Sequence, residues 1–236
     1  AAEGETVHGH IAGHNQLRYD VTDAFEPYED YRSDARAIKE DAIERLPELI
    51  ETVTAAVEAN GGTVYVADDA ADANRYITEL AAEQDAESVV KSKSMTTEEI
   101  DVNEALEAAG VEVWETDLGE FVVQVAGETP SHLVGPAMHK TKAEIKALFE
   151  AHFDPDEPLE TAEDLTAFAR DFLGEKIRAA DIGMTGANFV LAESGTVVLV
   201  TNEGNARKSA VTPDTHVAVA GVEKLIPSIG ELEPFV

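Results

Sequence analysis

Hydrophobic residues recur at helical spacing in the first quarter of the chain. From Ser33 onward, apolar positions three and four residues apart predict a helix that closes at 60–62, where Asn-Gly-Gly is a stop signal. Pro47 should kink this helix or divide it in two. Residues 1–32 are polar, contain several glycines and show no sustained period, which predicts an extended N-terminal arm of low order. One domain is then expected over 33–236.

Beyond this helix, strand-like and helix-like segments alternate. The pattern predicts strands at 63–67, 88–91 and 111–115, with helices at about 70–84 and 96–109 between them. This βαβ rhythm is typical of a parallel sheet with helices on its faces. The fold class that we expect is therefore α/β, with an open sheet covered on both sides.

The second half of the chain continues with a β-like run at 121–126 and two further helices at about 141–152 and 162–179. The last third then changes character, because short apolar runs broken by Gly suggest consecutive strands in one buried sheet. These runs lie at 181–184, 189–192, 196–201 and 215–220.

The charge of the chain is strongly negative. Its 236 residues include 48 Asp and Glu against 17 Lys and Arg, a formal net charge of -31 that is spread along the whole length. Molar salt shortens the Debye length to about 3 Å and would relieve the self-repulsion, so we expect a halophilic protein. The alternative is a mesophilic acidic protein with a basic partner. Duplex nucleic acid is not an expected ligand, because no Lys/Arg cluster is present to bind phosphates.

The sequence contains no cysteine. It therefore has no disulfides, and no iron–sulfur cluster can be ligated by this stretch alone. The chain also has neither a signal peptide pattern nor an apolar run of about 18 residues. We expect a cytoplasmic protein that does not insert into a membrane.

Common nucleotide and metal motifs are missing, since the sequence has no Walker A loop, G-x-G-x-x-G, H-E-x-x-H or C-x-x-C. The Gly-rich segment 183–188 could expose backbone N–H groups to an anion, or could equally be a tight turn. The histidines at 8, 10 and 14 could chelate a metal, but we interpret them as incidental because a mobile arm holds no fixed geometry.

The segment after the strand at 88–91 is the first candidate site. Lys91, Ser92 and further hydroxyls precede a helix that Thr96 and Glu99 would open as a capping box. Cations, hydroxyls and helix N–H groups would then surround one point at the carboxyl end of a strand, which suits a carboxylate or phosphate. Ordinary capping with solvated lysines is the alternative.

Two more groups of residues could carry chemistry. Glu120, His132 and His139 could act as general acids or bases or bind a divalent metal, although a histidine is more often a structural hydrogen-bonding group. Carboxylates and amides also flank the apolar run at 196–201 and should line a cleft or a turn, because burying an unpaired carboxylate is costly. These are Glu193, Asn202 and Glu203; a hairpin turn would explain 202–205 but not Glu193.

Several motifs in order resemble the LUD domain family of lactate-utilisation proteins, most closely the iron–sulfur B-type members in an acidic, haloarchaeal-type form. The motifs are KSKSMTTEEI, NEALEAAGVEVWETDLGE, PSHLVGPAMHK, DIGMTGANFVLAESGTVVLVTNEGN and HVAVAGVEKLIPS, and the match runs from about Arg36 to Pro227. The resemblance implies a NagB/RpiA/CoA-transferase-like α/β fold. It also implies a multi-subunit complex that oxidises L-lactate to pyruvate and passes electrons to iron–sulfur clusters.

B-type members continue into a cysteine-rich, ferredoxin-like region that this sequence does not contain. No cofactor is therefore expected within this chain, and 4Fe-4S clusters are expected in the missing region or in a partner subunit. The expected partners are the other lactate-utilisation subunits and a small carboxylate, and a homodimer is among the expected assemblies. Whether the chain is itself an enzyme stays open, since a fold alone does not define a reaction.

Three hypotheses follow. In the first, the chain is a redox-complex subunit whose cleft binds a small carboxylate or an organic cofactor. Lys91 and Ser92 hold the anion and His132 or His139 takes the hydroxyl proton, and the cleft is also lined by Glu120, Glu193, Asn202 and Glu203. In the second, the chain is an isomerase or CoA transferase that uses Glu193 as base or nucleophile on an anionic substrate. In the third, it is a non-catalytic assembly module.

Overall fold

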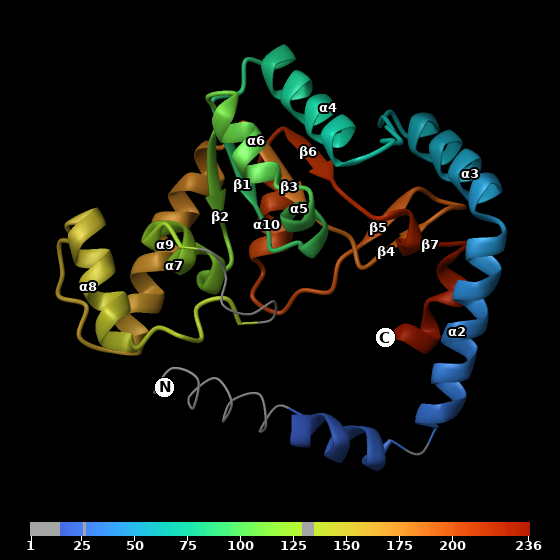
Figure 1. Ribbon diagram of the computed structural model, residues 1–236, viewed down its shortest axis with the longest axis horizontal. Coiled ribbons are helices and arrows are strands. Elements are labelled where there is room, and N and C mark those ends of the chain that lie inside the picture. Colours follow the sequence, from blue (N-terminus) through green and yellow to red (C-terminus); the bar gives the residue numbers. More distant parts are fainter. Residues whose placement is uncertain (1–14, 26, 129–134) are drawn as a thin grey trace. The chain divides into compact units, whose positions relative to one another are not determined.

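A computed structural model describes residues 15–25, 27–128 and 135–236 (Figure 1). The chain divides into two compact units. We call Val66–Gly186 with Leu199–Val219 the central unit, and Ala1–Tyr65 with Ala187–Val198 and Ala220–Val236 the terminal unit. Across the described ranges, no helix is long and apolar enough to span a membrane.

The central unit is built on a four-stranded parallel sheet. Its strands are β1 (Ser88–Lys91), β2 (Glu112–Glu115), β3 (Ile182–Thr185) and β6 (Thr215–Ala218), in the order β2-β1-β3-β6. Because helices flank this sheet, the inner strands β1 and β3 are almost fully buried. The expected α/β class with an open sheet is confirmed.

Two groups of helices pack around this sheet. Helices α4 (Ala70–Glu83) and α6 (Val102–Ala108) bury apolar side chains together with those of β1, β2 and β3. A second cluster joins α7 (Leu118–Ala126), α8 (Lys142–Phe153) and α9 (Ala162–Ala179), which lie together beside β2 in Figure 1. It is dominated by phenylalanines, whose rings pack at centroid distances such as 4.6 Å between Phe153 and Phe172. The short helices α5 (Met95–Glu99) and α10 (Asn205–Val211) complete the unit.

In the terminal unit, two long helices pack on a small sheet. Helices α2 (Tyr28–Glu44) and α3 (Leu46–Ala59) share a core with strands β4 (Phe189–Leu191) and β7 (Leu225–Ile226), and β5 (Thr196–Val198) completes the order β5-β4-β7. Three 3-10 turns, η1 (Val222–Lys224), η2 (Ile229–Glu231) and η3 (Glu233–Phe235), lie near the end of the chain. The expected division at Pro47 is confirmed, because α2 ends at Glu44 and Pro47 stands in the first turn of α3.

Several predicted elements are confirmed closely. These are the helix at 70–84, the strands at 88–91 and 111–115, and the helices at 141–152 and 162–179. The helix predicted at 96–109 is divided into α5 and α6, since Asp101 adopts a left-handed backbone with φ 53°. The N-cap of α5 is Ser94, whose hydroxyl accepts a hydrogen bond from the Thr97 N–H. The predicted capping box at 96–99 is therefore wrong.

Three predictions of backbone conformation are wrong. Residues 63–67 form no strand, and Tyr65 and Val66 are exposed where the chain passes between the two units. Residues 121–126 belong to helix α7, because the Asp117 side chain caps the helix and its apolar face packs among α8 and α9. The described part of the expected extended arm is helical, at 15–24 and from Tyr28 onward.

The last third of the chain does not form one sheet of consecutive strands. Strands β3 and β6 belong to the parallel sheet of the central unit, while β4 and β5 form an antiparallel pair in the terminal unit. The segment 202–205 is not a hairpin turn, since Gly204, with φ 80°, is the N-cap of α10. Short apolar runs have the same sequence pattern in a parallel sheet and in an antiparallel pair. Periodicity alone therefore could not assign these strands to one sheet or the other.

Candidate functional site

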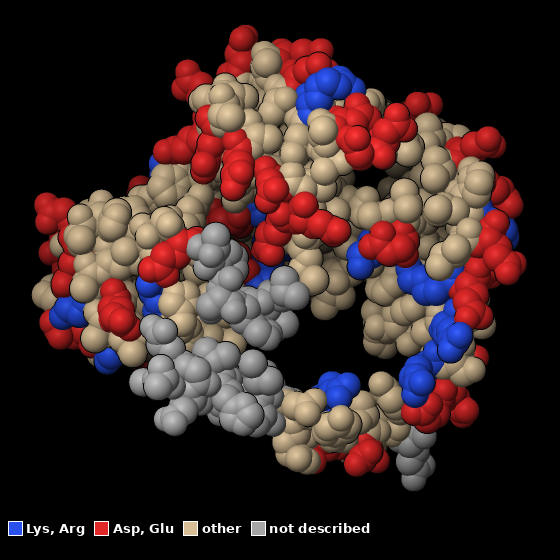
Figure 2. Space-filling view, viewed as in Figure 1, with Lys and Arg blue, Asp and Glu red and all other residues tan. Residues whose placement is uncertain are grey.

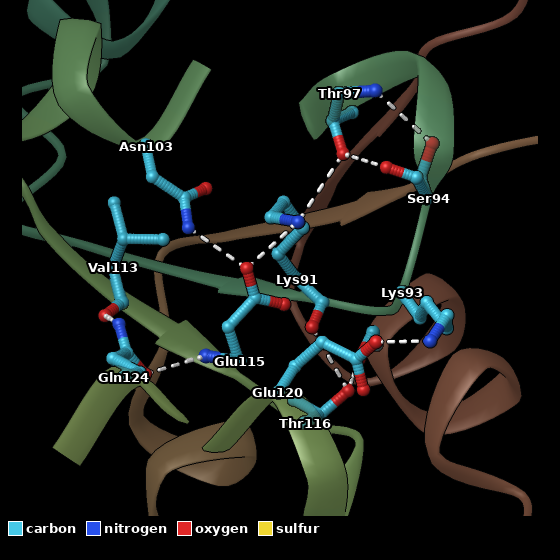
Figure 3. Close-up of polar contacts among 11 residues, drawn as sticks. Lys91, Lys93, Ser94, Thr97, Asn103, Val113, Glu115, Thr116, Glu120 and Gln124 are labelled. Carbon is cyan, nitrogen blue, oxygen red and sulfur yellow. Dashed lines mark hydrogen bonds and ion pairs between the residues drawn. The ribbon is translucent and has the colours of Figure 1, made fainter. Parts of the chain in front are cut away.

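Lys91 and Glu115 lie side by side at the carboxyl ends of β1 and β2. The two residues are register partners, and their Nζ and Oε1 atoms are 2.8 Å apart. Because side chains alternate along strands, both point to the same face as Val89 and Val113, which α4 and α6 cover. Their side chains are only 1% and 7% exposed, so this is a buried ion pair (Figure 3).

A polar network surrounds this pair. Lys91 Nζ donates to Thr97 Oγ1 at 3.2 Å, and Asn103 Nδ2 donates to Glu115 Oε1 at 2.8 Å. The backbone N–H of Glu115 donates to Oε1 of Gln124, whose amide nitrogen donates back to the Val113 carbonyl (Figure 3). Helices α5, α6 and α7 therefore each contribute a side chain that holds the pair in place.

The opposite face of the same strand ends is equally fixed. Thr116 donates both its backbone N–H and its hydroxyl to the Lys91 carbonyl, at 2.8 and 3.0 Å. Its hydroxyl also lies 3.4 Å from that of Ser209 on α10. Helix α10 approaches β3 so closely that a Cβ on Gly183 would lie 1.7 Å from the Ser209 carbonyl oxygen. Only glycine fits at that point of β3.

Lys93 and Glu120 form a second ion pair beside the first. Lys93 follows β1 and Glu120 lies in the first turn of α7, and the ammonium contacts the carboxylate (Figure 3). Their side chains are 26% and 4% exposed. Burial, reinforced by the neighbouring Asp117 and opposed by Lys93, raises the pKa of Glu120 to about 7. Glu120 can therefore exchange a proton near neutral pH.

The position of these groups in the sheet favours ligand binding. In the order β2-β1-β3-β6, the chain runs from β1 to β2 on one side and returns to β3 on the other. The strand order thus reverses between β1 and β3, and ligands of open α/β sheets bind outside the carboxyl ends of strands at such a switch point. Ser92, Lys93 and Ser94 follow β1 at this point, and a Cβ on Gly186, after β3, would lie 2.7 Å from the Ser94 hydroxyl.

Of the residues predicted from the sequence, the structure brings three to this switch point. Lys91 is fully buried in its ion pair, Ser92 is buried with its N–H bonded to the Met184 carbonyl, and Glu120 pairs with Lys93. His139 instead pairs through Nε2 with the exposed Glu128 carboxylate at 2.8 Å. His132 and the histidines at 8, 10 and 14 lie outside the described residues.

The other predicted residues are exposed. Asn202 and Glu203 precede α10 in the central unit, and Glu203 lines a pocket together with Thr116. Glu193 lies on the turn between β4 and β5 of the terminal unit, and its backbone N–H donates to the Pro227 carbonyl. Catalytic roles for His132, His139 and Glu193 stay predictions.

The sequence reasoning did not single out Glu115, Asn103 or Lys93. Glu115 stands at the end of a predicted strand. A signal was present, because two predicted strands each end in a charged residue, one in Lys91 and the other in Glu115. Lys93 stands two residues after Lys91, where the strand has already ended. The contribution of Asn103 depends on the break at Asp101, which the sequence pattern does not indicate.

Metal and cluster ligands are scarce in this site. Within the described ranges, no three His, Asp or Glu side chains gather as a metal site would require. Iron–sulfur clusters need thiolates, and the sequence has no cysteine, so its residues do not fit such a cluster.

Fold and site together define an α/β domain whose ionisable residues gather at the carboxyl ends of a parallel sheet. The chain belongs to the LUD domain family, which matches residues 50–236.

Several curated proteins are similar to most of the chain. Lactate utilization protein B of Shouchella clausii (strain KSM-K16) is 44% identical over 207 residues, which are 87% of this chain and 43% of that protein. "Uncharacterized electron transport protein YkgF" of Escherichia coli (strain K12) is 42% identical over 216 residues, covering 92% of this chain and 45% of that protein. The chain therefore spans about half the length of the curated relatives that it matches. No solved structure matches it.

Proposed function

We propose that this chain is the LUD-domain part of a lactate-utilisation protein and binds L-lactate and pyruvate at the switch point between β1 and β3. In this proposal it acts in a complex that oxidises lactate to pyruvate. Electrons leave to an organic hydride acceptor and then to iron–sulfur clusters, and the clusters are held outside this stretch of sequence. The names of the relatives support the lactate-utilising and electron-transport context.

The Lys93–Glu120 pair is the observation that carries the proposal. An ammonium that is partly exposed at the switch point can bind the carboxylate of a 2-hydroxy acid. Glu120, with a pKa of about 7, is partly ionised at neutral pH and can accept the proton of the substrate hydroxyl. The hydride on C2 goes to the acceptor, since no side chain of this chain can take two electrons.

The buried Lys91–Glu115 pair has a different role in this proposal. Lys91 is fully buried and already bonded to Glu115 and Thr97, so it positions the end of β1 rather than binding the substrate. The anion-binding role expected for Lys91 is therefore assigned to Lys93.

The test measures binding of L-lactate and pyruvate to the purified chain in molar KCl by thermal shift and calorimetry. A ligand at 100 times its dissociation constant should stabilise the fold by about 2.7 kcal/mol. Lys93→Gln should abolish this binding. Lys146→Gln is the matched control, because Lys146 is similarly exposed, at 29%, and forms an ion pair with Glu160 elsewhere in the central unit.

The pH dependence of pyruvate binding gives a second readout. An ionised Glu120 competes with the ligand carboxylate for Lys93, so the dissociation constant should rise as the pH passes through about 7. Glu120→Gln should flatten this dependence. Binding of sugar phosphates or CoA esters that Lys93→Gln abolishes, without binding of lactate or pyruvate, would instead favour an isomerase or transferase. No response to any of these ligands would favour an assembly module.

A further inference from the structure

Four cationic side chains of this strongly acidic chain stand apart from the rest. Most Lys and Arg side chains bond to carboxylates or carbonyls, as Arg45 does with Asp41 and Glu48. Across the described ranges, four instead form neither an ion pair nor a side-chain hydrogen bond; they are Arg170, Arg178, Arg207 and Lys208. A cation without a carboxylate partner is available to an external anion, and it becomes informative where several such cations gather around one hollow.

Two of these cations line one pocket of the central unit. This pocket, with a volume of about 380 Å³, lies between α9, the start of α10 and the residues that follow β2. Its apolar wall is one face of α9, where Ala169, Leu173 and Ile177 are buried. Arg170 and Lys208 line it and also an adjoining hollow that Arg178 shares.

The polar groups of the pocket are mixed rather than purely basic. Glu203 contributes a carboxylate, and Thr116, Thr166 and Asn205 contribute hydroxyls and an amide. The adjoining hollow also contains the carboxylates of Asp171 and Glu175. Cations, hydrogen-bonding groups and an apolar wall together suit a ligand that carries an anionic group, hydroxyls and an apolar ring.

Gly174 supplies an independent reason to regard the pocket as a binding site. It lies inside the 18-residue helix α9 and lines the pocket. A glycine inside a helix costs about 1 kcal/mol relative to alanine. No close packing requires it here, because a Cβ would have only Arg178 Nη1 nearby, at 3.4 Å. The missing side chain does, however, keep the space above the helix open.

We propose that this pocket binds an organic phosphate of the mononucleotide class. Arg170 and Lys208 would hold the phosphate, Glu203 would accept hydrogen bonds from sugar hydroxyls, and the base would lie against Leu173 and Ile177. The pocket volume falls in the range of small-molecule sites, about 300–1,000 Å³. This site does not depend on the lactate site proposed above, because Lys93 and Glu120 do not line it.

The test titrates AMP, NMN and FMN, with inorganic phosphate for comparison, into the purified chain by calorimetry. At least one nucleotide should bind at least tenfold more tightly than inorganic phosphate. Arg170→Gln and Lys208→Gln should each weaken this binding about tenfold, whereas Arg207→Gln should change it less than twofold. Arg207 is the matched control, since it is an exposed, unpaired cation next to Lys208 that lines neither hollow.

Gly174→Leu tests the pocket without removing a charge. Its side chain should fill the space and abolish nucleotide binding, while the midpoint of thermal unfolding stays equal or rises. Lys93→Gln should leave nucleotide binding intact. A wrong assignment of the nucleotide pocket can therefore be distinguished from a wrong assignment of the lactate site. Absence of nucleotide binding, equal losses with Arg170→Gln and Arg207→Gln, or undiminished binding by Gly174→Leu would overturn the proposal.

Discussion

Lys91 and Glu115 are register partners on adjacent parallel strands, and their side chains form an ion pair of 2.8 Å that is almost fully buried. A buried pair of this kind gains little net free energy, because the cost of desolvating both charges offsets their attraction. What it does fix is geometry: it joins β1 to β2 and to the helices that bear Thr97 and Asn103. The ends of both strands, where the candidate site begins, are thereby held in place.

Removing one partner of this pair should destabilise the chain strongly. Glu115→Ala leaves the Lys91 ammonium buried without its counter-charge, and we expect a loss of about 3–5 kcal/mol in unfolding free energy. The double variant Lys91→Met with Glu115→Leu should recover most of that loss, since it buries no charge. Urea denaturation of the three chains measures both effects. If Glu115→Ala and the double variant were equally unstable, packing rather than charge would explain the effect.

The ionisation of Glu120 should make stability depend on pH. Its pKa is raised from 4.5 to about 7 in the folded chain, so folding favours the protonated form. The stability that Glu120 contributes is fully present below about pH 4.5 and is lost as the pH rises through about 7. Glu120→Gln cannot ionise. Relative to the unmodified chain, this variant should therefore gain about 1–3 kcal/mol between pH 4.5 and 8.

Chemical denaturation at several pH values measures this gain. Glu128→Gln is a useful control, because Glu128 is exposed and its pKa is lowered by Lys140 and His139. That variant should show no gain as the pH rises over the same interval. A pH-independent difference between Glu120→Gln and the unmodified chain would contradict the raised pKa.

Two glycines should respond oppositely to alanine. At Gly183 a Cβ would lie 1.7 Å from the Ser209 carbonyl, so Gly183→Ala forces β3 and α10 apart and should cost about 3 kcal/mol or more. At Gly174 a Cβ meets only the end of the flexible Arg178 side chain, and Gly174→Ala should stabilise α9 by up to about 1 kcal/mol. Thermal unfolding compares the two. Similar midpoints for both variants would show that the close approach of α10 to β3 is not rigid.

Sequence pattern predicted the fold where periodicity and end signals agree. The helix at 162–179 has a clear period, and the strand at 88–91 is a short apolar run that ends at a polar segment; both are confirmed. Residues 121–126 read as a strand because Phe and Val favour strands locally, but the packing of Phe121 among aromatic residues of α8 and α9 makes them helical. Such tertiary effects are not visible in the local sequence.

The candidate site could be predicted only in part, because some of its residues are brought together by contacts between distant parts of the chain. The cations and hydroxyls after β1 are contiguous in sequence, so their gathering at a strand end could be predicted. Glu115 and Asn103 reach the site through strand register and a helix break, which depend on contacts distant in sequence. The pocket beside α9 needs α9 and α10 together, and α10 itself was not predicted.

Salt should stabilise this chain. Acidic side chains are scattered over the visible face and exceed the basic ones there (Figure 2), and the net charge is -31. Molar KCl also weakens favourable surface pairs such as Arg36–Glu40, but each exposed pair contributes at most about 1 kcal/mol. Repulsion among the many unpaired carboxylates destabilises the fold by more than these pairs stabilise it. Molar salt shortens the Debye length to about 3 Å and removes most of this repulsion. The buried Lys91–Glu115 pair is shielded from salt and should be unaffected.

We therefore expect the midpoint of thermal unfolding to rise by about 5 °C or more between about 0.15 and 3 M KCl, which corresponds to about 2 kcal/mol for a chain of this size. Differential scanning calorimetry across a KCl series measures the shift, and a sucrose series of matched osmolality controls for general exclusion of solutes. Since screening saturates as the Debye length falls, most of the rise should occur below about 1 M. A midpoint that stays constant or falls over this range would mean that the dispersed acidity does not destabilise the fold, and would favour a basic partner as its reason.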